Sequence, residues 1–188
     1  MKLEKLPLKD MFLVHREVFE DERGRFSRLF ASDELSKAGL PIKAIHINSS
    51  TSTKTGTLRG IHFQFPPYAE AKIVSCTAGS IWDLGVDLRP GSKTRFQWFA
   101  TELNPENGKS LIIPEGFGHA FITLKPNSTA VYVVSEKYSI ENESGIRFND
   151  PMLDIKWPIK PVVLSKKDSI WDDISGRIEE LNRGFGLK

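Results

Sequence analysis

Cysteine is almost absent from the sequence, with Cys76 alone among 188 residues. A single thiol excludes an intrachain disulfide framework and a cysteine-rich zinc site. Cys76 lies within the apolar run 73–77, which shows no neighbour able to activate a thiol nucleophile. We therefore expect a buried, inert thiol.

Long apolar runs and an excess of one charge are also missing. No segment approaches the roughly 18 apolar residues of a membrane span, and the N-terminus lacks the continuous apolar stretch of a signal peptide. Lys and Arg number 26 and Asp and Glu 24, and the resulting net charge of +2 is scattered along the chain. The sequence predicts a cytoplasmic protein that binds neither membranes nor nucleic acid. Its length fits one domain, residues 1–188.

Short β-prone runs separated by turn-forming residues make up the middle of the chain, and almost none of it repeats at helical periodicity. Ala78-Gly79, Pro90-Gly91 and residues 104–108 are good turn formers. Many short strands at roughly ten-residue spacing predict an all-β fold, a sandwich or a barrel. The expected strands are residues 12–19, 26–30, 42–49, 57–63, 71–77, 80–88, 96–103, 111–113, 119–124 and 130–136.

Helices are expected only at the margins of this β region. Ser32 is an N-cap candidate, acids follow it in the first turn, and Gly39 is a natural stop, so a short helix is predicted at about 33–38. A weaker helical signal covers residues 175–182.

Histidine is scarce, with four residues in the chain, so each position can be considered separately. A β-barrel metal site often shows two histidines one residue apart, and His62-Phe63-Gln64 lacks the second. His62 and His119 both follow glycine-containing segments, and Lys72 lies in a strand expected to be buried. Together with Arg59 and Tyr132 they would form a pocket with anion-binding cations and an acid/base pair. A lone histidine in a strand is otherwise a hydrogen-bonded structural residue, and spacing alone leaves both interpretations open.

Several common catalytic signatures are absent. The chain contains no G-x-S-x-G, no G-x-x-x-x-G-K-[ST] and no G-x-G-x-x-G pattern. A serine hydrolase, a P-loop nucleotidase and a dinucleotide-binding enzyme are thereby disfavoured. Proton chemistry and plain binding remain.

Seven further segments stand out in order along the chain: residues 21–26 (DERGRF), 58–64 (LRGIHFQ), 66–72 (PPYAEAK), 86–89 (VDLR), 113–121 (IPEGFGHAF), 145–151 (GIRFNDP) and 164–168 (LSKKD). Together they resemble the dTDP-4-dehydrorhamnose 3,5-epimerase family, and the match runs from about residue 10 to 170. Their order and coverage make the resemblance far more specific than any short pattern.

The resemblance implies a cupin-type β jelly roll, a homodimer, no metal and no cofactor, and a nucleotide-diphospho-4-keto-6-deoxyhexose as substrate. In that family a histidine paired with a late aspartate removes the proton α to the ketone, and the matching residues are His62 and Asp168. A tyrosine that protonates the opposite face matches Tyr132, and the lysine facing the C4 oxygen matches Lys72.

Substrate-binding residues of the family also have counterparts in this chain. Arg23 and Arg59 match its diphosphate-binding cations, His119 matches a residue that lines the sugar pocket, and Tyr138 matches an aromatic that stacks on the base. The full set that the resemblance implies for substrate binding is Arg23, Arg59, His119, Asn48, Phe26, Tyr138, Glu143 and Lys167.

Two positions depart from the rhamnose-pathway members. Arg28 stands where they have an acid, and His46-Ile47-Asn48 stands where they have Gln-x-Asn. We expect inversion at both C3 and C5 of dTDP-4-dehydro-6-deoxy-D-glucose. The alternatives are a single-centre epimerase of another dTDP-, CDP- or GDP-ketosugar, a catalytically inactive cupin that binds nucleotide sugars, and a metal-dependent cupin.

Overall fold

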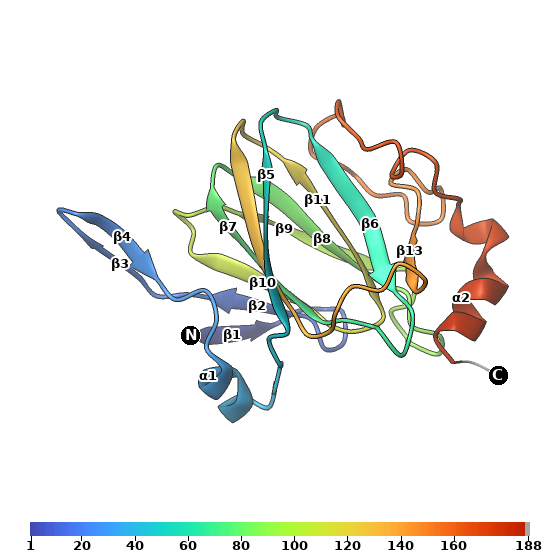
Figure 1. Cartoon of the computed structure of the whole chain (residues 1–188), viewed down its shortest axis with the longest axis horizontal. Helices are drawn as coiled ribbons and strands as arrows, with labels where there is room; N and C mark the ends of the chain where they lie inside the picture. Colours follow the sequence, from blue (N-terminus) through green and yellow to red (C-terminus); the bar gives the residue numbers. More distant parts are fainter. Residues whose placement is uncertain (187–188) are drawn as a thin grey trace.

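The protein is built from two antiparallel β-sheets that face each other, as the computed structural model of residues 1–186 shows (Figure 1). This arrangement is the cupin-type jelly roll expected from the sequence. The six-stranded sheet runs in the order β1 (Lys2–Lys5), β2 (Phe12–His15), β10 (Lys109–Ile113), β7 (Lys72–Ala78), β12 (Ser128–Val134) and β5 (His46–Ser52). The five-stranded sheet runs in the order β13 (Glu143–Gly145), β6 (Leu58–Gln64), β11 (Phe117–Thr123), β8 (Ile81–Asp87) and β9 (Trp98–Leu103).

Both faces of the six-stranded sheet carry apolar side chains along its central strands, because both faces are covered. Val74 and Leu111 pack into the core between the sheets, against Phe117 and other residues of the five-stranded sheet. Their chain neighbours Ile73 and Ile112 point to the other face. That outer face is covered by Leu35 and other apolar residues of the N-terminal region. The sequence therefore reads as continuous apolar runs here instead of a polar–apolar alternation.

Two short helices lie at the margins. Helix α1 (Ser32–Lys37) confirms the helix predicted at 33–38. The predicted second helix is a 3₁₀ turn, η1 (Ile174–Gly176), followed by α2 (Ile178–Gly184). The structure also contains β1 and β13, which the sequence patterns did not predict.

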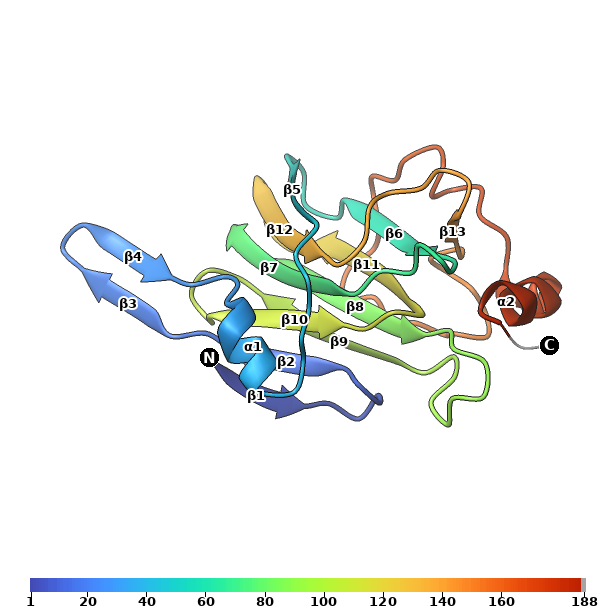
Figure 2. The same ribbon diagram turned by 60° about the horizontal axis from the view of Figure 1, so that its bottom comes forward.

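The predicted strand 12–19 is wrong, because the chain leaves the sheet after His15. Arg16 is buried, and its guanidinium donates to Ser27 Oγ at 2.6 Å and to the Lys109 carbonyl at 3.4 Å. Beyond it, β3 (Val18–Asp21) and β4 (Gly24–Ser27) pair only with each other. This hairpin stands clear of the two sheets in both views (Figures 1 and 2). The predicted strand 26–30 ends at Ser27, and the one predicted at 42–49 begins at His46 and runs to Ser52.

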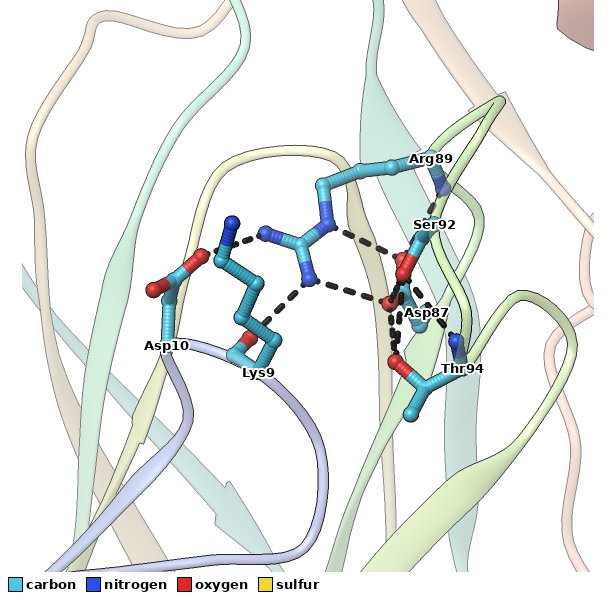
Figure 3. Close-up of polar contacts among 6 residues, drawn as sticks. All are labelled: Lys9, Asp10, Asp87, Arg89, Ser92 and Thr94. Carbon is cyan, nitrogen blue, oxygen red and sulfur yellow. Dashed lines mark hydrogen bonds and ion pairs between the residues drawn. The ribbon is translucent and has the colours of Figure 1, made fainter.

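A buried carboxylate fixes the loop between β8 and β9. Asp87 has no exposed surface and accepts hydrogen bonds from the backbone and guanidinium of Arg89 and from the hydroxyls of Ser92 and Thr94 (Figure 3). Arg89 also donates to the Asp10 carboxylate and the Lys9 carbonyl, which ties this loop to the turn between β1 and β2. Although burial opposes ionisation, these donors hold the pKa of Asp87 below its ordinary value.

Candidate active site

Two adjoining cavities open between the sheets and share His62, Lys72 and Tyr132. The larger has a volume of about 460 Å³ and the smaller about 250 Å³. His62 comes from β6 of the five-stranded sheet, whereas Lys72 and Tyr132 come from β7 and β12 of the other. Besides the shared residues, the larger cavity is lined by Ser50, Thr57, Leu58, Arg59, His119, Phe121, Val163, Leu164, Ser165, Lys167 and Asp168.

His62 and Asp168 form a hydrogen-bonded pair in this cavity. Nε2 of His62 lies 2.5 Å from Oδ1 of Asp168, whose side chain is 3% exposed while that of His62 is 31% exposed. Burial opposes ionisation of Asp168, but the contact with His62 and the Gly60 backbone N–H outweigh it and lower the pKa of the carboxyl group. An ionised carboxylate behind an open imidazole holds one tautomer of the ring and stabilises its protonated form.

A C-terminal segment, residues 163–171, brings Asp168 to the sheet. Val163 forms an isolated parallel bridge with Thr57, and its carbonyl accepts from the Leu58 N–H at 2.9 Å. At the other end, the Trp171 ring lies against Gly145 and its carbonyl accepts from Arg147 Nε at 3.1 Å. The turn carrying Asp168 is therefore held at both ends and has no strand partner of its own.

Gly60 allows the close packing that places His62. Its φ of +127° is one that side-chain-bearing residues rarely adopt, and a Cβ there would lie 2.4 Å from the Ala120 Cβ and 2.6 Å from the His119 carbonyl. We expect Gly60→Ala to lower the free energy of unfolding by at least about 2 kcal/mol, measured by denaturant titration. Gly176→Ala is the matched control, because a Cβ at Gly176 meets nothing within 4 Å. Equal stability of the two variants would contradict this account.

Lys72 and Tyr132 face His62 from the opposite sheet. Nζ of Lys72 lies 3.1 Å from Oε1 of Glu70, and its side chain is only 12% exposed. Burial raises the pKa of the Tyr132 phenol, and the negative charge of Glu70 adds to the effect while Arg59 opposes it. At neutral pH the phenol therefore keeps its proton and can donate it.

A second histidine–aspartate pair lies beside the first. His119, on β11, is the direct cross-strand partner of His62 on β6. Its Nε2 lies 2.8 Å from Oδ1 of Asp83, a carboxylate with no exposed surface. Asp83 was not identified from the sequence; the signal available was an acidic residue in the apolar run Ile81–Leu84.

The remaining predicted binding residues divide into two groups. Arg59 and Lys167 line the larger cavity, and Asn48, Tyr138 and Glu143 line the smaller. At the mouth, the Tyr138 hydroxyl donates to Glu143 at 2.6 Å, and Lys167 pairs with the same carboxylate. His46 also lines the smaller cavity, whereas Arg28 lies outside both and pairs with Glu34 at 3.3 Å.

Arg23 and Phe26 line neither cavity. Both belong to the projecting hairpin, where the Arg23 side chain is 85% exposed and pairs with Asp21 at 2.5 Å. Phe26 is 63% exposed and lies near Phe19, with 6.4 Å between ring centroids. Within one chain, therefore, the structure does not bring these two predicted binding residues to the site.

Within residues 1–186, no three His, Cys, Asp or Glu side chains are grouped so that they could hold a metal ion. None of the helices in this range is long and apolar enough to cross a membrane.

Comparison with known proteins places this geometry in a family. The family model described as dTDP-4-dehydrorhamnose 3,5-epimerase matches residues 5–175. The chain belongs to this family. The match spans both sheets and includes the His62–Asp168 pair, Lys72, Tyr132 and the projecting hairpin.

Individual members of the dTDP-4-dehydrorhamnose 3,5-epimerase family agree over most of their length. The enzyme of that name from Sinorhizobium fredii (strain NBRC 101917 / NGR234) is 39% identical over 170 residues, covering 90% of this chain and 87% of the relative. The crystal structure of dTDP-6-deoxy-D-glucose-3,5-epimerase from Legionella pneumophila Philadelphia 1, in complex with dTDP-4-keto-L-rhamnose, superposes with a TM-score of 0.90. It is 32% identical, and the match covers 96% of each chain. A dTDP-4-dehydrorhamnose 3-epimerase from Streptomyces niveus is 34% identical over 169 residues, covering 89% of this chain and 81% of the relative.

Proposed function

We propose that this protein epimerises dTDP-4-dehydro-6-deoxy-D-glucose at C3 and C5, giving dTDP-4-dehydro-L-rhamnose. The observation that carries the proposal is the placement of His62, paired with Asp168, and Tyr132 on opposite sheets of one cavity. Family membership supports it, and a relative with TM-score 0.90 holds dTDP-4-keto-L-rhamnose. The whole chain acts as one domain in the cytoplasm.

The first step is removal of a proton from carbon. A C–H bond next to a ketone becomes acidic only when the charge moving onto the carbonyl oxygen is stabilised. His62 takes the proton, the C–H electron pair forms a C=C bond, and the carbonyl electrons move to the C4 oxygen. Lys72, 12% exposed and paired with Glu70, stabilises that oxygen, and Asp168 stabilises the imidazolium.

Inversion requires a new proton on the other face of the sugar. A base that returned its own proton would only regenerate the starting material. Tyr132 comes from the sheet facing His62, and burial keeps its phenol protonated. It donates that proton to the enolate carbon, and exchange with water then resets both residues.

Fixed cations bind the diphosphate. Arg59 and Lys167 stand at the larger cavity, where their charges match the phosphate oxygens. The smaller cavity, with Asn48, Glu143 and the exposed ring of Tyr138, receives the nucleoside, because an open aromatic face can stack on a base.

We also propose that the active unit is a homodimer in which the β3–β4 hairpin of each subunit reaches the other subunit's cavity. Two observations support this arrangement. The hairpin stands clear of its own body (Figure 1), and it carries a cation and two phenylalanines that are 59% and 63% exposed. Docked on a partner, it would bury this apolar pair and add Arg23 and Phe26 to the substrate site.

Mixing two inactive variants tests the shared site. Arg23→Ala and His62→Ala should each have little activity alone. In a mixed dimer, however, one of the two sites combines an intact body with an intact hairpin. After refolding of an equal mixture, random pairing should restore about a quarter of wild-type activity per subunit. No recovery, in a mixture that sedimentation shows to be dimeric, would contradict a hairpin contributed by the partner.

The test of the reaction itself is proton NMR in D₂O with dTDP-4-keto-6-deoxyglucose. Loss of the C3 and C5 proton signals is the expected result, since each removed proton is replaced by deuterium. Loss at one carbon only would show a single-centre epimerase instead of a double epimerase. The Streptomyces niveus relative bears the name of such an enzyme, a 3-epimerase. Loss at neither carbon with dTDP-, CDP- and GDP-linked substrates would overturn the proposed function.

A further inference from the structure

Asp83 is a buried acidic residue that the mechanism above does not use. Strands β6, β11 and β8 lie side by side, and they carry His62, His119 and Asp83 respectively. His119 is opposite His62, and Asp83 is opposite Phe121, two residues after His119 on the same strand. Alternation along a strand therefore puts the three side chains on one face, toward the cavity.

The Asp83 carboxylate is only half satisfied by the protein. Oδ1 pairs with His119 Nε2 at 2.8 Å, but Oδ2 is buried and has no hydrogen-bond partner among residues 1–186. Burial raises the pKa of Asp83, and the contact with His119 and the nearby Lys72 oppose that rise. Burying such a group costs folding free energy, and an amide in its place would lower that cost because it carries no charge to desolvate.

The hydrogen bond to Asp83 has a chemical consequence for His119. The Nε2–H of the ring donates a hydrogen bond to the carboxylate oxygen, which leaves Nδ1 of the neutral ring as a hydrogen-bond acceptor. His119 lines the larger cavity, and no hydrogen bond of Nδ1 is found in the described part of the chain. A sugar placed over His62 lies beside the His119 ring, because the two histidines are cross-strand neighbours.

We propose that Asp83 is a positioning residue that holds the Nε2-protonated tautomer of His119, so that Nδ1 accepts a ring hydroxyl of the ketosugar and sets which α-carbon faces His62. The proposal rests on the proposed function and extends it from the reaction to its regiochemistry. C3 and C5 flank the same ketone, so a rotation of the sugar exchanges one for the other above a single base. A fixed hydroxyl contact opposes that rotation.

Asp83→Asn is the test, with Asp87→Asn as the matched control. Both aspartates are on β8 and both are fully buried, but Asp87 lines neither cavity and is satisfied by Arg89, Ser92 and Thr94 (Figure 3). An amide can present either its oxygen or its NH₂ group to His119, so it can pair with either tautomer of the imidazole ring.

For Asp83→Asn we expect total exchange in D₂O to fall by about tenfold to a hundredfold, and the ratio of C3 to C5 exchange to change at least about fivefold. Its melting temperature should stay equal to that of the wild type or rise. The control should melt lower and keep the wild-type ratio. If Asp83→Asn keeps the wild-type ratio of C3 to C5 exchange, whether or not its melting temperature falls, Asp83 has a structural role only.

Histidine ¹⁵N NMR separates this proposal from the proposed function, because it needs no substrate. In the wild type, His119 should show the Nε2-protonated tautomer, assigned by its loss in His119→Gln. In Asp83→Asn the tautomers should mix. An Nδ1-protonated ring in the wild type would overturn the proposal even if the variant does not fold. If the wild-type protein exchanges neither the C3 nor the C5 proton, the proposed reaction is wrong. The histidine ¹⁵N spectra then decide by themselves whether Asp83 positions His119.

Discussion

Replacing His62 with alanine should slow deuterium incorporation at both C3 and C5 by at least about a hundredfold, since a positioned general base contributes about 10² to 10⁴ in rate. The imidazole is the group in the cavity that combines an open edge with an ionised partner, Asp168, at 2.5 Å. Without it the carboxylate remains, but it lies behind the ring, away from the substrate. The rates can be followed in D₂O by the decay of the two proton signals.

His15→Ala is the control for that variant. His15 is a surface histidine whose Nε2 contacts Glu4 at 2.7 Å, and it lines neither cavity. Its replacement should leave both exchange rates unchanged. Near-normal exchange in His62→Ala would exclude His62 as the base, and Glu143, which lines the neighbouring cavity, would be the next residue to replace.

Replacing Tyr132 with phenylalanine should separate exchange from inversion. The ring and its packing remain while the proton donor is lost, so epimer formation should fall by about 10² to 10⁴. Removal of the proton by His62 continues, and return of deuterium to the same face still erases the proton signal. The measurement is a pair of rates from one NMR series: signal loss and appearance of the epimer.

Tyr68→Phe is the matched control for the tyrosine, because Tyr68 lies outside both cavities and below a lysine ammonium, with Lys137 Nζ 5.4 Å from its ring centroid. It should keep the wild-type ratio of inversion to exchange. If exchange and inversion fell in parallel in Tyr132→Phe, the phenol would be needed for proton removal and not for delivery to the second face.

Strand prediction succeeded where burial alone decides the residue types. In β7, β8 and β11 both faces of each strand are covered, so the apolar runs marked these strands within a residue or two. It failed at residues 12–19, where the strand ends at His15, Arg16 is buried, and the chain continues into the β3–β4 hairpin. The amino acids of the hairpin are ordinary strand formers, and their pattern does not say which strand they pair with.

Site prediction depended on the family resemblance more than on residue patterns. His62, Lys72 and Tyr132 lie on regular strands, where spacing gave their direction but not their convergence. Asp168 lies in an irregular turn 106 residues from His62, a separation no local pattern can bridge. Asp83 was not predicted because a single aspartate in an apolar strand forms no pattern that indicates a site. Its partner His119 is 36 positions away in the sequence.

The segment 163–171 allows the enzyme to lose activity while the rest of its fold stays intact. Its backbone is attached at its two ends, by the bridge at Val163 and by the Trp171 carbonyl, and side chains of Lys167 and Asp168 hold its middle, while the sheets are held by continuous strand ladders. Opening a segment with few backbone hydrogen bonds costs less free energy than unfolding the whole domain. Each opening withdraws Asp168 from His62 and leaves the barrel intact. On heating, catalysis should therefore fade while circular dichroism still reports a native β-sheet, and reclosing on cooling should restore it.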